Sequence, residues 1–260
     1  MRALGRLSAE ALWLALPFIA IAISWELVAR AGLFPPKLFP SLEVVVATAW
    51  RLIVSGIIWA NTEGTLIRLA AGFALAAAVG VVLGIAMGRY RCVEDFFFPI
   101  VSIGYPIPGL AYAPLFVLWF GLGDLPAILL VAVASTFVVI INTWKGVKAV
   151  KPIWIRAAES MGASGRQMFW KIMLPGALPY IITGLRLGLA QAWRILIAVE
   201  MLVAVPQGLG RMIFGAQEFL NTDVMLAGIA MIGVIGLVLE KQVFERLERY
   251  TVVRWGMMTA

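Results

Sequence analysis

Residues 155–179 read IRAAESMGASGRQMFWKIMLPGALP, a basic stretch that glycines interrupt and that lies between long apolar runs. Pro152 suits the first turn of a helix, and Gly162 can end that helix. Ser164 can cap a second helix that stops before Pro175. The connection that holds this stretch is far longer than the 2–8 residues, roughly, that usually join two helices. Its large apolar residues argue against disorder, so we expect two short helices, joined by a glycine bend, at a membrane surface.

The rest of the chain has the composition of a membrane protein. Of its 260 residues, 62% are hydrophobic and 13% are charged, against roughly 45–50% apolar and about 25% charged in soluble domains. Several runs approach the ~20 apolar residues that a helix needs to cross a bilayer, and none alternates as barrel strands do. We therefore predict an all-α integral membrane fold. A single domain, 1–260, would have six transmembrane helices at about 11–29, 65–88, 96–120, 125–143, 178–204 and 224–243, with the connection 144–177 between the fourth and the fifth.

Positive charges indicate the orientation, because lysine and arginine are retained on the cytoplasmic side. With the N-terminus inside, 14 of the 21 lysines and arginines lie in cytoplasmic segments, and both termini are cytoplasmic. This topology explains the net charge of +7, so we expect no nucleic-acid partner. The 14 are Arg2, Arg6, Arg89, Arg91, Lys145, Lys148, Lys151, Arg156, Arg166, Lys171, Lys241, Arg246, Arg249 and Arg254. Five others, Arg30, Lys37, Arg51, Arg68 and Arg211, fall in outer segments.

The fifth predicted span carries three charged residues, Arg186, Arg194 and Glu200. An arginine at the bilayer centre costs about 2.5–3.5 kcal/mol on insertion scales, so these side chains should face protein or water. At about 100° per residue, all three could face one side of the helix. Arg194 lies nearest the middle and is the first candidate for attracting an anion, since a guanidinium matches carboxylate, sulfonate or nitrate.

Each of the other two charges has an alternative interpretation. Arg186 can form a structural ion pair or extend its guanidinium to the membrane surface. Glu200 can pair with an arginine or act in a gate, and its carboxylate also leaves a zwitterionic or weakly cationic substrate open.

The third predicted span contains Pro106, Pro108 and Pro114. Proline removes a backbone donor and kinks a helix, and broken backbone at membrane depth is tolerated only against protein or a water-filled cavity. We therefore expect Tyr105, Pro106 and Pro108 to line a translocation pathway. A kinked helix that only packs against its neighbours is the alternative.

Several kinds of chemistry are excluded by what the sequence lacks. The chain has no histidine and one cysteine, which leaves no His/Cys metal site, haem ligation or internal disulfide. It has no G-x-x-x-x-G-K-[ST] motif, so it cannot hydrolyse ATP by that route. An intramembrane enzyme would need a nucleophile and a base, or metal ligands, in the membrane, and the sequence offers no histidine and no facing carboxylate pair. We predict no catalytic residue, no metal and no cofactor.

The opening stretch resembles the EAA motif of bacterial ABC-transporter permeases. In AAESMGASGRQMFWKIMLP, residues 157–175, the matching positions are Ala157, Ala158, Gly162, Ile172, Leu174 and Pro175. FPSLEVV near residue 40, PIPGLAYAPLFVLWFGLGD from Pro106 and TGLRLGLAQAWRILIAVEML from Thr183 resemble the nitrate, sulfonate, taurine and bicarbonate permeases. The resemblance covers about 35–256.

This resemblance implies a type I ABC-importer transmembrane domain that acts as a homodimer in the bacterial inner membrane. The segment 144–177 would be its coupling region, with a helix that docks on a separate cytoplasmic ABC ATPase dimer. An extracytoplasmic binding protein would deliver a small organic or inorganic anion. Arg156 stands where the motif has its leading glutamate, and we expect the nearby Glu159 to take part of that acidic role. A secondary transporter driven by an ion gradient is the alternative, although such proteins normally show internal repeats that we do not find.

Overall fold

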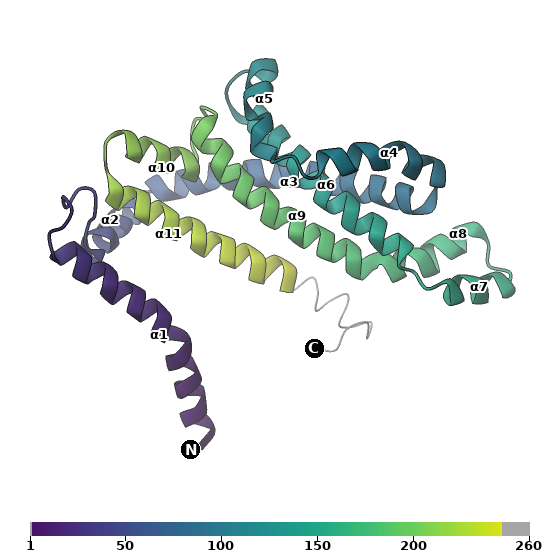
Figure 1. Cartoon of the computed structure of the whole chain (residues 1–260), viewed down its shortest axis with the longest axis horizontal. Helices are drawn as coiled ribbons and strands as arrows, with labels where there is room; N and C mark the ends of the chain where they lie inside the picture. The colour runs from purple at the N-terminus through teal and green to yellow at the C-terminus, as the bar shows by residue number, and fades with distance from the viewer. Residues whose placement is uncertain (1, 246–260) are drawn as a thin grey trace. The chain divides into compact units, whose positions relative to one another are not determined.

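The computed structural model describes the backbone of residues 2–245 and the side chains of Trp13 and 15–242 (Figure 1). Arg246, Arg249 and Arg254, which contribute to the predicted orientation, lie outside the described residues. All regular structure in the described part of the chain is helical. The α-helices are α1 (Arg2–Arg30), α2 (Leu42–Val54), α3 (Ile57–Arg89), α4 (Arg91–Gly104), α5 (Ala113–Phe120), α6 (Asp124–Lys148), α7 (Pro152–Ser160), α8 (Gly165–Met168), α9 (Leu174–Leu202), α10 (Leu209–Glu218) and α11 (Thr222–Leu239). A 3₁₀-helix, η1 (Gly109–Tyr112), and two π-helical turns, η2 (Phe169–Met173) and η3 (Glu240–Glu245), complete the set.

Four helical stretches in the described chain are long and apolar enough to cross a membrane. They are α3, α6, the continuous helix Gly165–Leu202 and the stretch Thr222–Gln242. A bent pair of helices between residues 91 and 120 could make a fifth. The predicted first span, 11–29, lies within α1, which is not among these four. The all-α membrane fold is confirmed, whereas the count of six spans remains a prediction.

The chain forms two compact units, and the first holds residues 1–60 and 212–231. Within it, the Trp25 ring stacks on Phe39 with the ring centroids 4.1 Å apart. Ser41 stands at the N-cap of α2, but its side chain makes no capping hydrogen bond. The Glu26 carboxylate instead accepts a hydrogen bond from the Leu42 N–H at 3.0 Å, which satisfies one of the free donors at the start of α2.

The second unit holds residues 61–211 and the chain from 232 onward, and glycines let its helices approach closely. A Cβ at Gly80 of α3 would fall 2.6 Å from the Cβ of Val139, and one at Gly84 would fall 2.6 Å from the Cβ of Thr143. A Cβ at Gly188 of α9 would fall 2.7 Å from a Val139 methyl carbon. Because small residues at a helix interface bring two backbones together in a membrane, these positions fix α6 against both α3 and α9. Fully buried side chains here include Leu130, Val131, Val139, Ala192, Leu196 and Val199.

The third predicted span, 96–120, is not one straight helix. Helix α4 and the η1–α5 segment meet at an angle of 91°. The break contains Pro106 and Pro108, which lack the N–H groups that would continue a helix. Just after it, a Cβ at Gly109 would come 2.5 Å from the Cβ of Ala134, so a glycine lets the broken backbone lie against α6.

Candidate functional site

The first feature of the site is the pair of short helices α7 and α8, which lie at one end of α6 and α9 (Figure 1). The predicted start of the first helix and the predicted bend are confirmed: Pro152 begins α7, and Gly162 has φ +74° in the bend. Ser164 and Gln167 form a capping box at α8. The Gln167 N–H donates to Ser164 Oγ at 3.3 Å, and the Ser164 N–H donates to Gln167 Oε1 at 2.9 Å. The bend therefore has a defined geometry set by its own sequence.

The second short helix does not stop before Pro175, contrary to the prediction. It continues through the π-helical turn η2 into α9, so residues 165–202 form one helical stretch. Pro175 lies in the first turn of α9. We attribute the continuity to η2, because a π turn changes the hydrogen-bond register just where proline offers no N–H to the preceding turn.

The residues of the predicted coupling motif divide into exposed and packed groups. On α7, Arg156, Ala157 and Glu159 are exposed, while Ala158 is 8% exposed. No ion pair of Arg156 or Glu159 is found in the described part of the chain. The remaining members lie in the bend, in η2 and at the start of α9: Gly162, Ile172, Leu174 and Pro175. The motif thus presents two charges on the exposed side of α7, whereas Ala158 is buried and Ile172, Leu174 and Pro175 are partly buried.

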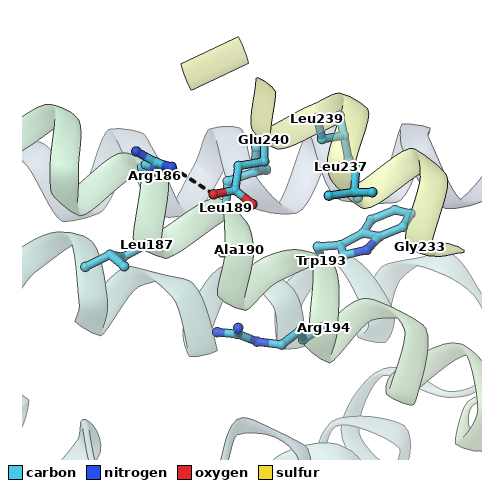
Figure 2. A pocket seen from close by; sticks show the side chains of 11 residues that line it. Arg186, Leu187, Leu189, Ala190, Trp193, Arg194, Gly233, Leu237, Leu239 and Glu240 are labelled. Atoms are coloured by element: carbon cyan, nitrogen blue, oxygen red, sulfur yellow. Dashed lines mark hydrogen bonds and ion pairs between the residues drawn. The ribbon is translucent and has the colours of Figure 1, made fainter. Parts of the chain in front are cut away.

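Arg186 and Arg194 line one pocket of about 300 Å³ between α9 and the end of α11 (Figure 2). Arg186 Nη2 lies 2.8 Å from Glu240 Oε1, which is the ion pair that we considered as its alternative role. The Arg194 side chain extends away from that pair. In the described part of the chain no carboxylate pairs with Arg194, and its Nη2 donates to Gln191 Oε1 at 3.2 Å.

A second pocket, of about 270 Å³, lies beside the break in the third predicted span. Its lining includes Tyr105, Tyr112, Phe137 and Gln191. Gln191 lines this pocket and also accepts the hydrogen bond from Arg194, so it connects the residues at the break to Arg194. Pro106 and Pro108 are exposed at the break itself and do not line this pocket.

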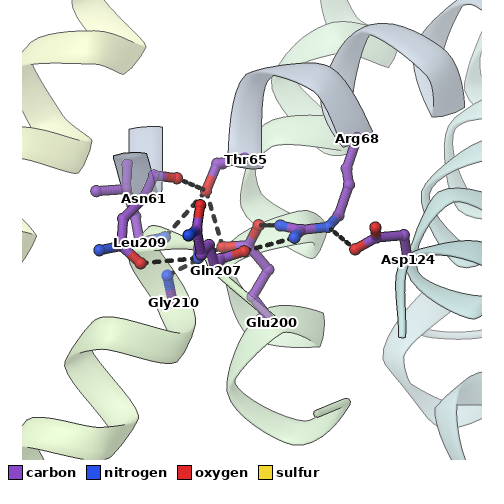
Figure 3. A network of polar contacts seen from close by, with 9 residues as sticks. Asn61, Thr65, Arg68, Asp124, Glu200, Gln207, Leu209 and Gly210 are labelled. Carbon is purple, nitrogen blue, oxygen red and sulfur yellow. Dashed lines mark hydrogen bonds and ion pairs between the residues drawn. The ribbon is translucent and has the colours of Figure 1, made fainter. Parts of the chain in front are cut away.

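Glu200 lies apart from these pockets in a buried polar network (Figure 3). Its side chain is 0% exposed, and Arg68 Nη1 donates to Oε1 at 2.6 Å. The Thr65 hydroxyl and the Gly210 N–H each lie 3.0 Å from Oε2. The arrangement is the arginine pairing that we considered as an alternative for Glu200. The three charges of α9 are consequently not gathered at one site: Arg186 and Arg194 line a pocket, and Glu200 is enclosed in the network.

Arg68 joins four segments of the chain, and the sequence analysis missed this role by assigning it only to an outer segment. Besides Glu200 on α9, its Nε lies 2.7 Å from Asp124 Oδ1 at the start of α6, and Nη2 donates to the Gln207 carbonyl. A signal was present in the predicted topology. The start of the second span and the end of the fifth lie on the same side of the membrane, so opposite charges at 68 and 200 are at matching depth.

Two glycines of the loop before α10 are explained by this network. A Cβ at Gly208 would lie 2.6 Å from the Glu200 carboxylate, and one at Gly210 would lie 2.9 Å from the Glu200 Cβ. The Gly208 N–H donates to Asn61 Oδ1 at 2.9 Å, and the Leu209 N–H donates to Thr65 Oγ1 at 3.0 Å. The loop can therefore pack against the Glu200 carboxylate only because positions 208 and 210 carry no side chain.

Comparison with known proteins identifies relatives over most of the chain. Residues 80–241 match the family model of the binding-protein-dependent transport system inner membrane component. The taurine transport system permease protein TauC of Escherichia coli is 41% identical over 83% of this chain and 80% of its own length. A putative aliphatic sulfonates transport permease protein SsuC of Bacillus subtilis is 34% identical over 93% of this chain and 86% of its own. The bicarbonate transport system permease protein CmpB of Synechocystis is 29% identical over 86% and 82%, respectively.

Solved structures support the same fold. A structure of the MetNI methionine ABC transporter in an inward-facing conformation matches with a TM-score of 0.58 at 23% identity, covering 77% of this chain and 96% of that one. An amino acid ABC transporter crystallised with histidines matches with a TM-score of 0.61 at 17% identity, over 77% and 96%. The predicted fold, an ABC-importer transmembrane domain, is thereby confirmed.

Proposed function

Because the chain belongs to the family of inner-membrane components of binding-protein-dependent transport systems, we propose that it forms the translocation pathway of an ATP-driven importer for a small anion. The chain is a multi-pass membrane permease, and in this family ATP hydrolysis belongs to a separate subunit. The substrate, the partners and the orientation are proposals.

The proposed substrate class is an organic sulfonate such as taurine, or a related small anion. Arg194 carries this proposal. It lies inside a transmembrane helix, lines a pocket of about 300 Å³ and has no carboxylate partner in the described chain. A guanidinium in such a place attracts an anion, because an arginine without a counterion in a membrane should face water or a ligand. The relatives named for taurine, aliphatic sulfonates and bicarbonate support the same chemistry.

The proposed contact with the ATPase is α7. Arg156, Ala157 and Glu159 are exposed on this helix, and the capped bend beside it holds it in a fixed direction. A short helix with small residues and free charges suits a groove in a partner protein. In this arrangement α7 and both termini are cytoplasmic, two copies of the chain surround the pathway, and a binding protein delivers the substrate from the other side.

Reconstitution in proteoliposomes tests the proposal. We expect uptake of a labelled sulfonate only when the chain is combined with its cognate ATPase, the binding protein and ATP. ATP hydrolysis should rise when the loaded binding protein is added. Uptake by the chain alone on an ion gradient would instead identify a secondary transporter, and uptake of an amine in preference to every anion would overturn the substrate class.

A further inference from the structure

A pocket of about 370 Å³ lies where the end of α3 meets α8 and η2, away from the charged residues of α9. We call it the α3–α8 pocket. It combines basic, aromatic and aliphatic side chains, including Val82, Ile85, Arg89, Tyr90, Arg166 and Trp170. The proposed function gives none of these residues a role.

The basic part of the α3–α8 pocket is formed by Arg89 and Arg166. The Arg89 guanidinium lies over two rings, 5.3 Å from the Phe169 centroid and 5.5 Å from the Tyr90 centroid. Its Nε also lies 3.3 Å from the Tyr90 hydroxyl. These contacts orient the guanidinium and leave its charge uncompensated.

Neither arginine has a carboxylate partner in the described part of the chain. Two acids, Glu94 and Asp95, line an adjacent pocket with Arg89. They pair with other residues, Glu94 with Lys148 and Asp95 with Arg91. The two positive charges of the α3–α8 pocket are therefore available for an anion from outside the chain.

The apolar part of the pocket lies along a candidate membrane span, Ile57–Arg89. Val82 precedes Arg89 by seven residues on α3, which is roughly 10 Å along the helix axis at 1.5 Å per residue. Val82 is 69% exposed and belongs to a candidate membrane span. Trp170, 59% exposed, stands at the basic end, where aromatic side chains typically mark the membrane surface. A carboxylate of a soluble partner would use only the basic end of such a pocket.

We propose that the α3–α8 pocket binds an anionic phospholipid, with the phosphate between Arg89 and Arg166 and an acyl chain along Val82 and Ile85. Basic pockets between helices on the cytoplasmic side hold such headgroups, and a guanidinium matches the phosphate geometry. The leaflet rests on the proposed orientation. A lipid in this position contacts both α3 and the α8–η2 segment, so it fastens the coupling region to the membrane-spanning body.

Native mass spectrometry of the full-length purified chain tests the lipid site without any partner. The chain is titrated with dioleoyl-phosphatidylglycerol or with dioleoyl-phosphatidylcholine. We expect saturable binding of the first lipid and weaker, non-saturable binding of the second. The double variant R89Q/R166Q should bind phosphatidylglycerol at least about fivefold more weakly, because one basic residue near a membrane surface changes affinity by roughly that factor.

Matched variants separate the site from general charge and from folding. K171Q removes one positive charge from η2 outside the pocket lining and should leave the affinity unchanged. R89K/R166K keeps the charge and should recover most of the binding. V82Q changes only the apolar end and should also weaken lipid binding. If inorganic phosphate competes with the lipid and V82Q has no effect, the ligand is a free phosphate and the lipid proposal is wrong.

Two further outcomes would overturn the proposal. One is equal phosphatidylglycerol binding by the wild-type chain and R89Q/R166Q. The other is loss of ATPase assembly in R89Q/R166Q with unchanged lipid binding, which would assign both arginines to a protein partner. Failure of the proposed transport function appears separately, in the proteoliposome assay, and leaves the lipid titration interpretable.

Discussion

Charged side chains are buried and paired in the network around Glu200, whereas on the helix α7 they are exposed and form no ion pair within the described chain. In the network, Arg68 and Glu200 are almost fully buried, and three donors satisfy the carboxylate. On α7, Arg156 and Glu159 are exposed and form no ion pair within the described chain. A buried charge needs partners inside the protein, whereas an exposed charge is free to meet a partner outside it. The pairing of charges thus separates residues that hold helices together from residues that are exposed and, in our proposal, contact a second protein.

The largest expected effect is on the buried pair. R68M or E200M should lower the free energy of unfolding by about 3–5 kcal/mol, because each leaves a buried charge without its partner. Equilibrium unfolding in detergent–SDS mixtures measures this change. The double variant R68M/E200M should be less destabilised than the sum of the single effects. Independent, additive effects would show that the pair does not act as a unit, and the contrast with α7 would lose its basis.

A smaller effect is expected when the loop above the pair is crowded. G208A should cost about 1–3 kcal/mol, because its Cβ would lie 2.6 Å from the Glu200 carboxylate. G215A on α10 is the control, since a Cβ there meets nothing within 4 Å. An alanine inside a helix should be neutral or stabilising by up to about 1 kcal/mol. Equal stability of the two variants in the same unfolding assay would contradict the close packing of this loop.

Arg194 is intermediate between the two regions, since in the described part of the chain its guanidinium hydrogen-bonds the Gln191 side chain and pairs with no carboxylate. R194Q should reduce uptake at least about tenfold, which corresponds to the loss of roughly one charge-assisted contact. Assembly with the ATPase should be unchanged. R186Q removes an arginine that already pairs with Glu240 and should reduce uptake less. Initial rates of labelled sulfonate uptake in proteoliposomes provide the measurement, and normal uptake by R194Q would refute the anion role.

The smallest effect is expected at the exposed helix. E159Q should weaken the functional coupling to the ATPase by a factor of about 2–5, because exposed ion pairs contribute little individually. A double-mutant cycle between Glu159 and a basic residue of the ATPase, read by stimulated ATP hydrolysis, measures the coupling energy. Zero coupling in every such pair would remove the acidic role that we assign to Glu159. R156Q is the matched control on the same helix.

The sequence predicted the parts of the fold that local rules determine. Long apolar runs located α3, α6 and α9, and Pro152, Gly162 and Ser164 located the two short helices and their bend. Proline predicted the break in the third span, although not its angle of 91°. Local rules also produced one error, because a proline after η2 was read as a stop and the π turn that accommodates it has no sequence signal that we used.

The polar contacts were less predictable because they join distant segments. Arg68 and Glu200 are 132 residues apart, and each alone looks like an isolated charge at the end of an apolar run. In the sequence, Gly208 and Gly210 look like glycines of an ordinary flexible loop. Their role is visible only in the structure, where they pack against Glu200. The partner of Arg186, Glu240, could not be predicted either, because it lies on a distant segment of the chain. Helical periodicity placed three charges on α9 but could not tell which neighbours would reach them.

The continuous helix from Gly165 to Leu202 has a mechanical consequence. Its 38 residues span roughly 57 Å at 1.5 Å per residue, from the bend beside α7 to the buried polar network around Glu200. In the proposed importer, a displacement of α7 by the motor subunit would reach the far side of the bilayer along this rod without crossing a loop. The π turn η2 and Pro179, both near the α7 end, interrupt its regular winding. We therefore expect the helix to bend mainly near the ATPase, and its far end to move together with the buried network around Glu200.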